Sequence, residues 1–438
     1  MNCKDAALQA RSISISLSAL KREQKDAALE TIRKMLWENR ASIFEANRKD
    51  IERSKQENLP GPLLKRLKFD EEKLREVCSG IESLVRLPDP VGRVLSAREL
   101  DSGLNLYQIT CPIGVIGVIF ESRPDALVQI STLCLKSGNS VLLKGGKEAL
   151  ETNRALYSCI TDASQKAGIP EGWIHLLETR EEVNELLQMD TFVDLIIPRG
   201  SNEFVRYIMQ HSSIPVLGHA DGVCHLYVDE EAEIDKALRL TIDAKTQYPA
   251  VCNAIETLLV HRAIAPRFLP QLAKAFSERI PPVELRGCPR TRQMIPCKPA
   301  TEEDWKAEYL DYILAVKVVD TLEEAVTHIN TYGSRHTDGI VTSSRERAEY
   351  FMERVDSANV FWNASTRFSD GYRYGLGAEV GISTGKLHAR GPVGLEGLTT
   401  YKWRLYGNGH IVADYTGSTP KPFTHRPLPN RLPEQTAL

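Results

Sequence analysis

Cys252 is the cysteine whose surroundings in the sequence best suit covalent chemistry. It lies in the stretch 247–254, between a predicted helix over 234–245 and a predicted strand over 256–261. A loop that feeds a strand can expose a thiolate and surround its charge with backbone N–H groups, so Cys252 could act as a nucleophile. On spacing alone, Cys224 and the other thiols remain alternatives. Four cysteines fall on apolar faces, as inert core cysteines do: Cys78, Cys111, Cys134 and Cys159.

A second candidate site begins at Lys144, which ends the short apolar run 140–144 and is followed by two glycines and Lys147. Ligands of open α/β sheets lie beyond the carboxyl ends of the strands, and glycines let a phosphate or ribose approach the backbone. The chain has no GxGxxG fingerprint, and Val141 stands where a GxxxxGK phosphate loop needs its first glycine. The alternative is a strand-ending turn with solvated lysines.

Gly200 and Ser201 follow another apolar run, 195–197, and open a predicted helix. Free N–H groups and the helix dipole at such a point can bind a pyrophosphate. A glycine turn with Asn202 as the helix cap explains the same residues.

His219 and His225 flank the stretch 221–224, but their spacing matches no zinc pattern, so we expect no metal site. The nine cysteines include no CxxC pair and are expected to be reduced thiols.

The elements that must position these residues follow from hydrophobic periodicity. Asp70 is predicted to cap a helix that ends before the prolines of 87–90, and 94–108 is predicted to form a hairpin outside the main core. Two series of short apolar runs alternate with helical segments, which predicts parallel sheets covered by helices on both faces. The runs of the first series are 115–120, 140–144, 174–177 and 195–197; those of the second are 225–228, 256–261, 313–319, 339–342 and 360–363.

The predicted class is therefore α/β with two α/β domains that meet at a cleft. We assign 1–213 to a cofactor domain with an oligomerisation hairpin at 94–110. The catalytic domain covers 214–384, and 385–438 returns to the cofactor domain and ends in an oligomerisation tail.

Composition narrows the class of protein. A formal net charge of −3 argues against a nucleic-acid partner, since such proteins carry a basic excess. No apolar run approaches the roughly 20 residues that span a membrane, and the N-terminus does not resemble an export signal. A cytoplasmic enzyme is expected.

Several long stretches resemble the aldehyde dehydrogenase superfamily, from about residue 12 to residue 415. They are PIGVIGVIFESRP (112–124), QYPAVCNA (247–254), FWNASTRFSDG (361–371), GAEVGIS (377–383) and HARGP (388–392). The resemblance is closest to the members that reduce an acyl phosphate. It implies two Rossmann-like domains and NADPH-dependent reduction of L-glutamyl 5-phosphate to L-glutamate 5-semialdehyde, a step of proline biosynthesis. It also implies a homo-oligomer and a glutamate 5-kinase that supplies the labile substrate.

Three departures from the wider superfamily bear on the reaction. Hydrolytic members use a glutamate to activate water, and Val216 stands at the matching position, which favours a reductase. NAD-preferring members carry an acid where this chain has Lys147, so Lys144 and Lys147 favour NADP(H). The superfamily's oxyanion asparagine falls near Arg123, whose guanidinium suits a phosphorylated leaving group.

The resemblance also implies roles for individual residues. Cys252 and Asn253 would form the catalytic centre with Arg123, and Glu308 would hold the nicotinamide ribose. The substrate's α-carboxylate and α-amino group would meet four residues: Asn363, Ser365, Arg367 and Asp370. An Arg367–Asp370 surface pair is the alternative for the last two. Two rival functions remain. One is a hydrolytic NAD(P)-dependent dehydrogenase of another small aldehyde, and the other is a non-catalytic binding subunit.

Overall fold

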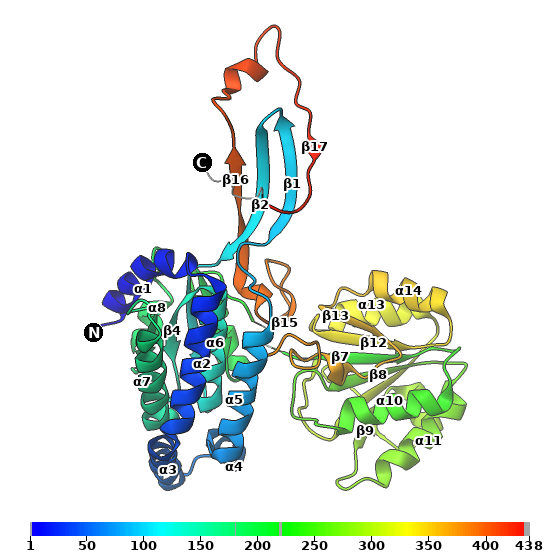
Figure 1. Cartoon of the computed structure of the whole chain (residues 1–438). Coiled ribbons are helices and arrows are strands. Elements are labelled where there is room, and N and C mark those ends of the chain that lie inside the picture. The colour runs from blue at the N-terminus through cyan, green and yellow to red at the C-terminus, as the bar shows by residue number, and fades with distance from the viewer. Residues whose placement is uncertain (1, 180, 219–220, 433–438) are drawn as a thin grey trace.

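The molecule consists of two α/β units side by side and a β arm that projects between them (Figure 1). The structure is a computed structural model that describes residues 2–179, 181–218 and 221–432. The first unit contains the N-terminus, and the chain returns to it after the second unit, because Val380, Val393 and Leu398 pack into its core. The arm is formed by segments from both ends of the chain.

The first unit is built on a parallel sheet in which β3 and β4 are buried along their whole length. Because side chains alternate across a strand, Ile116 and Val118 face one apolar cluster while Val115 and Ile119 face the other. The strand order is β5-β4-β3-β6. The strands are β3 (Val115–Phe120), β4 (Ser140–Lys144), β5 (Ile174–Leu177) and β6 (Leu195–Arg199).

Helices cover both faces of this sheet. The prediction that Asp70 caps a helix is confirmed, since its carboxylate accepts a hydrogen bond from the Lys73 N–H. The helices are α1 (Cys3–Ser18), α2 (Arg22–Glu38), α3 (Arg40–Gln56), α4 (Gly61–Leu67), α5 (Glu71–Arg86), α6 (Pro124–Ser137), α7 (Leu150–Lys166), α8 (Glu181–Leu186) and α9 (Asn202–His211).

The second unit is a seven-stranded parallel sheet with the order β10-β9-β11-β8-β7-β12-β13. Its strands are β7 (Cys224–Val228), β8 (Ile255–His261), β9 (Glu284–Gly287), β10 (Lys298–Pro299), β11 (Ile313–Val319), β12 (Thr337–Val341) and β13 (Asn359–Trp362). Its helices are α10 (Ile234–Thr246), α11 (Ala265–Ser277), α12 (Pro289–Met294), α13 (Leu322–Tyr332) and α14 (Arg345–Arg354). The predicted α/β class, with parallel strands between helices, is confirmed. β9 and β10 were not predicted, because they are short, mixed in polarity and lie at the sheet edge.

The arm is an antiparallel sheet in the order β16-β2-β1-β17. Its strands are β1 (Val94–Asp101), β2 (Leu104–Pro112), β16 (Thr399–Tyr406) and β17 (Arg426–Pro427). The predicted hairpin is β1–β2, and its turn contains Gly103 at φ 78°, a conformation that favours glycine. A small sheet of β14 (Gly381–Ser383) and β15 (Gly391–Val393) leads the chain back toward the arm.

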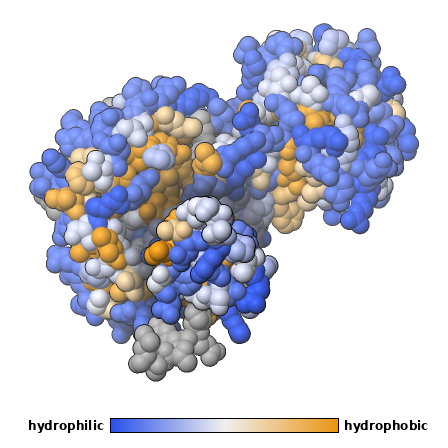
Figure 2. Space-filling model, turned by 90° about the horizontal axis from the view of Figure 1, so that it is seen from above, coloured by the Kyte–Doolittle hydropathy of each residue, from blue (hydrophilic) through white to orange (hydrophobic). Residues whose placement is uncertain are grey.

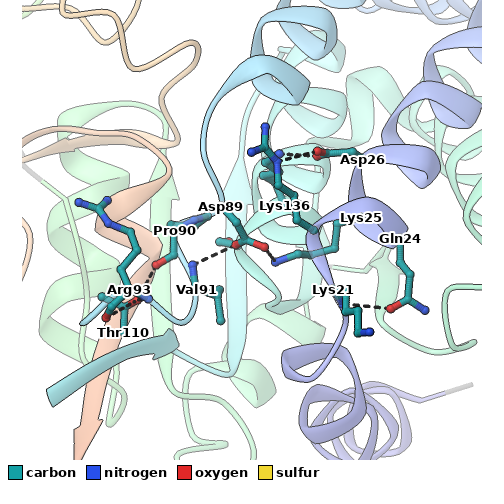
Figure 3. A network of polar contacts seen from close by, with 12 residues as sticks. Lys21, Gln24, Lys25, Asp26, Asp89, Pro90, Val91, Arg93, Thr110 and Lys136 are labelled. Atoms are coloured by element: carbon teal, nitrogen blue, oxygen red, sulfur yellow. Dashed lines mark hydrogen bonds and ion pairs between the residues drawn. The ribbon is translucent and has the colours of Figure 1, made fainter. Parts of the chain in front are cut away.

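A network of buried charges joins α2, α6 and the loop before β1 (Figure 3). Lys25 and Lys136 are almost completely buried. The Lys25 ammonium forms an ion pair with Asp89 at 2.6 Å, and Lys136 pairs with Asp26. The same Asp89 carboxylate accepts the Val91 N–H at 3.0 Å. Because a buried charge without a partner is costly, these pairs hold the helices in one arrangement against the base of the arm.

Candidate active site

Cys252 lies in the loop between α10 and β8, as predicted, and three contacts hold this loop. The Asn253 amide donates a hydrogen bond to the Ser369 carbonyl oxygen at 2.7 Å. The Cys224 thiol donates to the Cys252 carbonyl oxygen at 3.1 Å. Gly222 lies so close that a Cβ built on it would stand 2.5 Å from the Cβ of Cys252, so only glycine fits there. The thiol is therefore fixed in position while its residue keeps partial exposure.

The electrostatic surroundings of Cys252 keep its thiol protonated. Burial, together with the carboxylates of Glu308 and Glu379, raises the pKa of Cys252 to about 12, and the positive charge of Arg199 acts in the opposite direction. The sequence had suggested an exposed thiolate, whereas the structure gives a neutral thiol at pH 7. A base must therefore take the proton when the sulfur attacks.

Glu308 connects the two α/β units beside this thiol. The Asn202 side chain, at the start of α9 in the first unit, donates a hydrogen bond to its carboxylate. A backbone hydrogen bond from Gly222 reaches the same carboxylate, while burial raises the pKa of Glu308. Glu308 follows a short 3-10 helix (Asp304–Lys306), but it is half-buried and hydrogen-bonded rather than solvated.

The two predicted cofactor lysines have different surroundings. Lys144 is buried at the end of β4, its ammonium donates to the Gly145 carbonyl oxygen at 2.5 Å, and burial lowers its pKa. The Lys147 side chain is 84% exposed, and its ammonium lies 3.6 Å from the Glu57 carboxylate. Lys147 thus points toward solvent near α3, which weakens any electrostatic contribution that it makes to a bound ligand.

An acid that sequence reasoning did not single out lies next to these lysines. The Glu148 carboxylate accepts hydrogen bonds from the Ser122 N–H at 2.6 Å and the Ser122 hydroxyl at 2.8 Å. Its oxygen would stand 2.0 Å from a Cβ built on Gly146, so a side chain at position 146 would displace this carboxylate. The carboxylate ties the end of β3 to the turn after β4.

Gly200 and Ser201 form the turn from β6 into α9. The Ser201 hydroxyl accepts the Phe204 N–H at 3.4 Å, so Ser201 rather than Asn202 is the helix cap. The Ser201 N–H donates to Glu121 at 3.1 Å, and a Cβ on Gly200 would stand 2.5 Å from the same carboxylate. This turn lies at the carboxyl end of the parallel sheet, where dinucleotides bind in such folds.

The four predicted substrate residues follow β13, and the structure gives them different partners. Asn363 bonds the Thr342 backbone through both side-chain atoms, at 3.1 Å and 2.9 Å, so its amide joins two strand ends. The Ser365 hydroxyl accepts the Arg367 N–H at 3.4 Å. The Arg367 guanidinium donates to Gln247 at 2.9 Å, which connects it to the Cys252 loop.

Asp370 does not form the surface pair with Arg367 that the sequence left open. Its carboxylate lies 3.6 Å from Arg373 and accepts the N–H groups of Tyr372 and Arg373 at 3.0 and 3.1 Å. Arg367 is buried, and burial followed by the Arg373 charge lowers its pKa. Of the two side chains, Arg367 borders the nucleophile loop through Gln247, whereas Asp370 bonds within its own turn.

Comparison with known proteins identifies the family. The model of the aldehyde dehydrogenase family matches residues 12–282. This chain belongs to the aldehyde dehydrogenase family. It is 66% identical to the γ-glutamyl phosphate reductase of Pelotomaculum thermopropionicum over 98% of each chain. It is 62% identical to that of Acetivibrio thermocellus over 99% of this chain and all of the other. The crystal structure of γ-glutamyl phosphate reductase from Thermotoga maritima matches with a TM-score of 0.91 at 40% identity, covering 94% of this chain and all of the other. The resemblance seen in the sequence is confirmed.

In this aldehyde dehydrogenase, Val216 occupies an apolar setting. It pairs in parallel with Ile196 and packs against the cluster under α1 and α9. A valine side chain cannot activate water, so resistance of the thioester to hydrolysis stays a prediction that kinetics can test. His219, one of the two histidines considered as metal ligands, lies outside the described residues.

Two charged residues near Cys252 were not assigned from the sequence. The charge of Arg199, at the end of β6, acts on the thiol and on Glu379. The Glu379 carboxylate accepts the Gly371 N–H at 2.8 Å, and burial raises its pKa. Arg123, predicted to face the leaving group, pairs with Asp125 at 3.0 Å and acts electrostatically on both. The only signal in the sequence was that Arg199 directly precedes a strand-end glycine.

Neither a metal cluster nor a membrane-spanning helix occurs among the described residues. No group of three His, Cys, Asp or Glu residues there could hold a metal ion. In that same part of the chain, no helix has the length and apolar character that crossing a membrane requires.

Proposed function

We propose that this chain is a γ-glutamyl phosphate reductase that uses NADPH to reduce L-glutamyl 5-phosphate to L-glutamate 5-semialdehyde and phosphate, in proline biosynthesis. The observation that carries the proposal is the near full-length identity of 66% with a reductase of that name. The fixed Cys252 loop supports it, because reduction of an acyl phosphate through a thioester needs one positioned nucleophile.

The strand ends of the first unit fit a dinucleotide. The α9 N-terminus, which Gly200 and Ser201 precede, would offer N–H groups to a pyrophosphate. Lys144 and Lys147 would attract a 2′-phosphate, and Glu308 would hold the nicotinamide ribose. NADPH bound there supplies the hydride that takes the acyl group to the aldehyde level.

The chain's own groups carry the remaining steps. The Cys252 sulfur loses its proton and bonds the acyl carbon, and the C–O bond to phosphate breaks, so phosphate leaves with the electron pair. Glu308 and Glu379 are the carboxylates that act on this thiol, and one of them takes the proton. The Cys252 N–H stabilises the oxyanion. After reduction the C–S bond breaks, and the thiol regains its proton.

Recognition of the amino-acid part of the substrate is assigned to the loop after β13. Arg367, which contacts Gln247 of the Cys252 loop, would bind the α-carboxylate, and Asp370, three residues further on, would bind the α-ammonium. Asn363 and Ser365 support this loop through Thr342 and the Arg367 backbone.

The reverse reaction tests this proposal directly. Purified protein is mixed with glutamate 5-semialdehyde, NADP⁺ and phosphate, and NADPH absorbance is recorded. Phosphate-dependent absorbance is expected. Its absence in a folded, pure sample would exclude the proposed reaction.

The hydrolytic alternative is separated by leaving phosphate out. Because Val216 cannot activate water, semialdehyde and NADP⁺ should give a burst of about one NADPH per active site and then stop. Added phosphate should restart turnover. Steady turnover without phosphate would mean that another group activates water and would support a hydrolytic dehydrogenase.

We also propose that the protein is a homo-oligomer assembled through the arm. β16 is an edge strand, and Tyr401, Trp403 and Leu405 alternate along one of its faces with at least half of each side chain exposed. Hydrophobic residues reach the surface in the view onto the arm (Figure 2). Light scattering of Trp403→Ser should show smaller particles than wild type, and Lys402→Ser on the opposite face should not. A monomeric wild type would contradict this assembly.

The proposed reaction places the enzyme in the cytoplasm, where thiols stay reduced; all nine cysteines are free. Its substrate is a labile mixed anhydride, so a glutamate 5-kinase must produce it close by. Co-purification of such a kinase would test that coupling. A second test is whether semialdehyde forms faster, when both enzymes are present, than free diffusion of the substrate allows.

A further inference from the structure

Arg199 is a guanidinium without a hydrogen-bonding partner in the structure. It ends β6, opposite Phe120 of β3, and its carbonyl oxygen accepts the Glu121 N–H at 3.1 Å. Its side chain forms neither a hydrogen bond nor an ion pair with any residue in the described ranges. Burial, followed by the charge of Arg123, lowers the pKa of Arg199. The two guanidinium groups therefore act on each other, and of the two only Arg123 has a carboxylate partner, Asp125 at 3.0 Å.

Arg347 shows how this chain treats a guanidinium that serves only the fold. Its Nε and Nη2 donate to the two oxygens of the fully buried Asp229 at 2.7 and 2.6 Å. Such bidentate pairing satisfies the planar fork of an arginine. Arg199 has no comparable carboxylate, so its free donors point to a ligand with several anionic oxygens.

The position of Arg199 ties this ligand to the nucleophile. Its charge lowers the pKa of the Cys252 thiol against the effect of burial. A Cβ built on Gly381 would lie 3.5 Å from the Arg199 Cδ, so the start of β14 packs along its stem. Glu379, two residues earlier, is bound by the Gly371 N–H at 2.8 Å and acts on both Arg199 and Arg123.

We propose that Arg199 and Arg123 form the subsite for the phosphate group that leaves the acyl carbon attacked by Cys252. This inference rests on the proposed function. As the S–C bond forms and the C–O bond breaks, the phosphate takes the electron pair, and the two guanidinium groups neutralise the charge that develops. No acid is then needed to protonate the leaving group. The same subsite binds inorganic phosphate in the reverse direction.

A dinucleotide pyrophosphate has the same chemistry, and Arg199 directly precedes Gly200 and Ser201. The substrate phosphate is favoured because Arg199 also acts on the Cys252 thiol and lies beside Arg123, which starts a different helix, α6. The experiment therefore measures the two ligands separately.

The test uses the full chain with Arg199→Lys and Arg199→Gln, and Arg347→Lys as a matched control that removes a bidentate arginine elsewhere. Three quantities are measured: the KM for phosphate in the reverse reaction, the Kd of NADPH from its fluorescence, and the protection of Cys252 from iodoacetamide by inorganic phosphate alone. Arg199→Lys should raise the phosphate KM by about tenfold or more, the scale of one charge-assisted hydrogen bond. Phosphate protection should be lost, while the Kd of NADPH stays as in wild type.

Arg347→Lys should leave the phosphate KM and the protection unchanged, even if its melting temperature falls. The proposal is overturned if Arg199→Lys keeps the wild-type phosphate KM and protection. It is also overturned if the Kd of NADPH rises by the same factor, because the guanidinium would then serve the cofactor. If wild type produces no NADPH with phosphate but phosphate still protects Cys252, the proposed function fails while the anion subsite stands.

Discussion

Two groups of buried charges in this protein differ in whether the fold itself neutralises them. Lys25 and Lys136, between α2, α6 and the loop before β1, each have a carboxylate partner (Figure 3). Arg199 beside Cys252 has none among the described residues, and Glu379 is bound by one backbone N–H. Both groups carry a desolvation cost. In the first group, the ion pairs offset this desolvation cost and hold the helices together. In the second group, the cost is left for a bound ligand to offset.

The largest expected effect is in the second group. Cys252→Ala should lower turnover by at least about 10⁴-fold, because the thioester can no longer form. Cys297→Ala is the matched control, since that thiol is also only half-buried but lies beside Gly287 of β9 and outside the α10–β8 loop. Steady-state rates in the reverse reaction measure both. A Cys252→Ala enzyme with near wild-type turnover would rule out the thioester mechanism.

Removing a carboxylate partner from the first group should lower the free energy of unfolding and leave kcat/KM unchanged. Asp89→Ala leaves the Lys25 ammonium buried without its partner, so the free energy of unfolding should fall by about 3–5 kcal/mol. Urea denaturation measures this, with Lys34→Ala as the control, because Lys34 and Glu38 form an exposed pair at 3.8 Å. The control should change stability by less than about 1 kcal/mol. The first group would no longer be a purely structural one if both variants lost the same free energy of unfolding, or if Asp89→Ala changed kcat/KM.

Neutralising a charge of the second group should show the opposite pattern. Glu379→Gln keeps an acceptor for the Gly371 N–H but removes a carboxylate whose pKa burial raises above its ordinary 4.5. Turnover should fall by about tenfold, the effect of losing one catalytic or positioning charge, while stability at pH 8 should not fall.

The stability difference between Glu379→Gln and wild type should depend on pH, and the raised pKa of Glu379 fixes its sign. A carboxyl whose pKa is raised in the folded state favours folding at pH below its unfolded pKa. That contribution is lost as pH rises through the folded pKa. The melting temperature of Glu379→Gln should therefore match wild type near pH 4 and exceed it at pH 8. A variant that is less stable than wild type at pH 8 would show that the fold already compensates this charge.

The smallest expected effect concerns the exposed lysine of the cofactor site. Lys147→Glu should reduce the preference for NADPH over NADH by less than about fivefold, because an exposed, screened charge contributes little. The ratio of kcat/KM for the two cofactors measures it. Lys144→Met, at the buried lysine, should change the ratio more. The reverse order would mean that Lys147 turns inward when the cofactor binds.

The fold was predictable where a segment's own pattern decided its structure. The runs 115–120, 140–144 and 174–177 coincide with β3, β4 and β5, because fully apolar strands have no other place than a covered sheet. β9, β10 and β16 were missed, since their residues are mixed or polar and their strand structure depends on a neighbour. β16 pairs with β2 across nearly three hundred residues, from Thr399 opposite Pro112 to Tyr406 opposite Asn105.

The sequence by itself determined the α/β class and the glycines of the strand ends, and it predicted Cys252 as the nucleophile, because each follows from residue types next to one another in the chain. Only the tertiary structure decided which polar side chains are bonded within the protein and which remain able to bind a ligand. Asn363 is occupied by Thr342, and Lys147 turns toward Glu57. Arg199, by contrast, acts on Cys252 and Glu379, and its donors have no partner among the described residues. A side chain finds its partner on whichever element packs against it, and no local pattern carries that information.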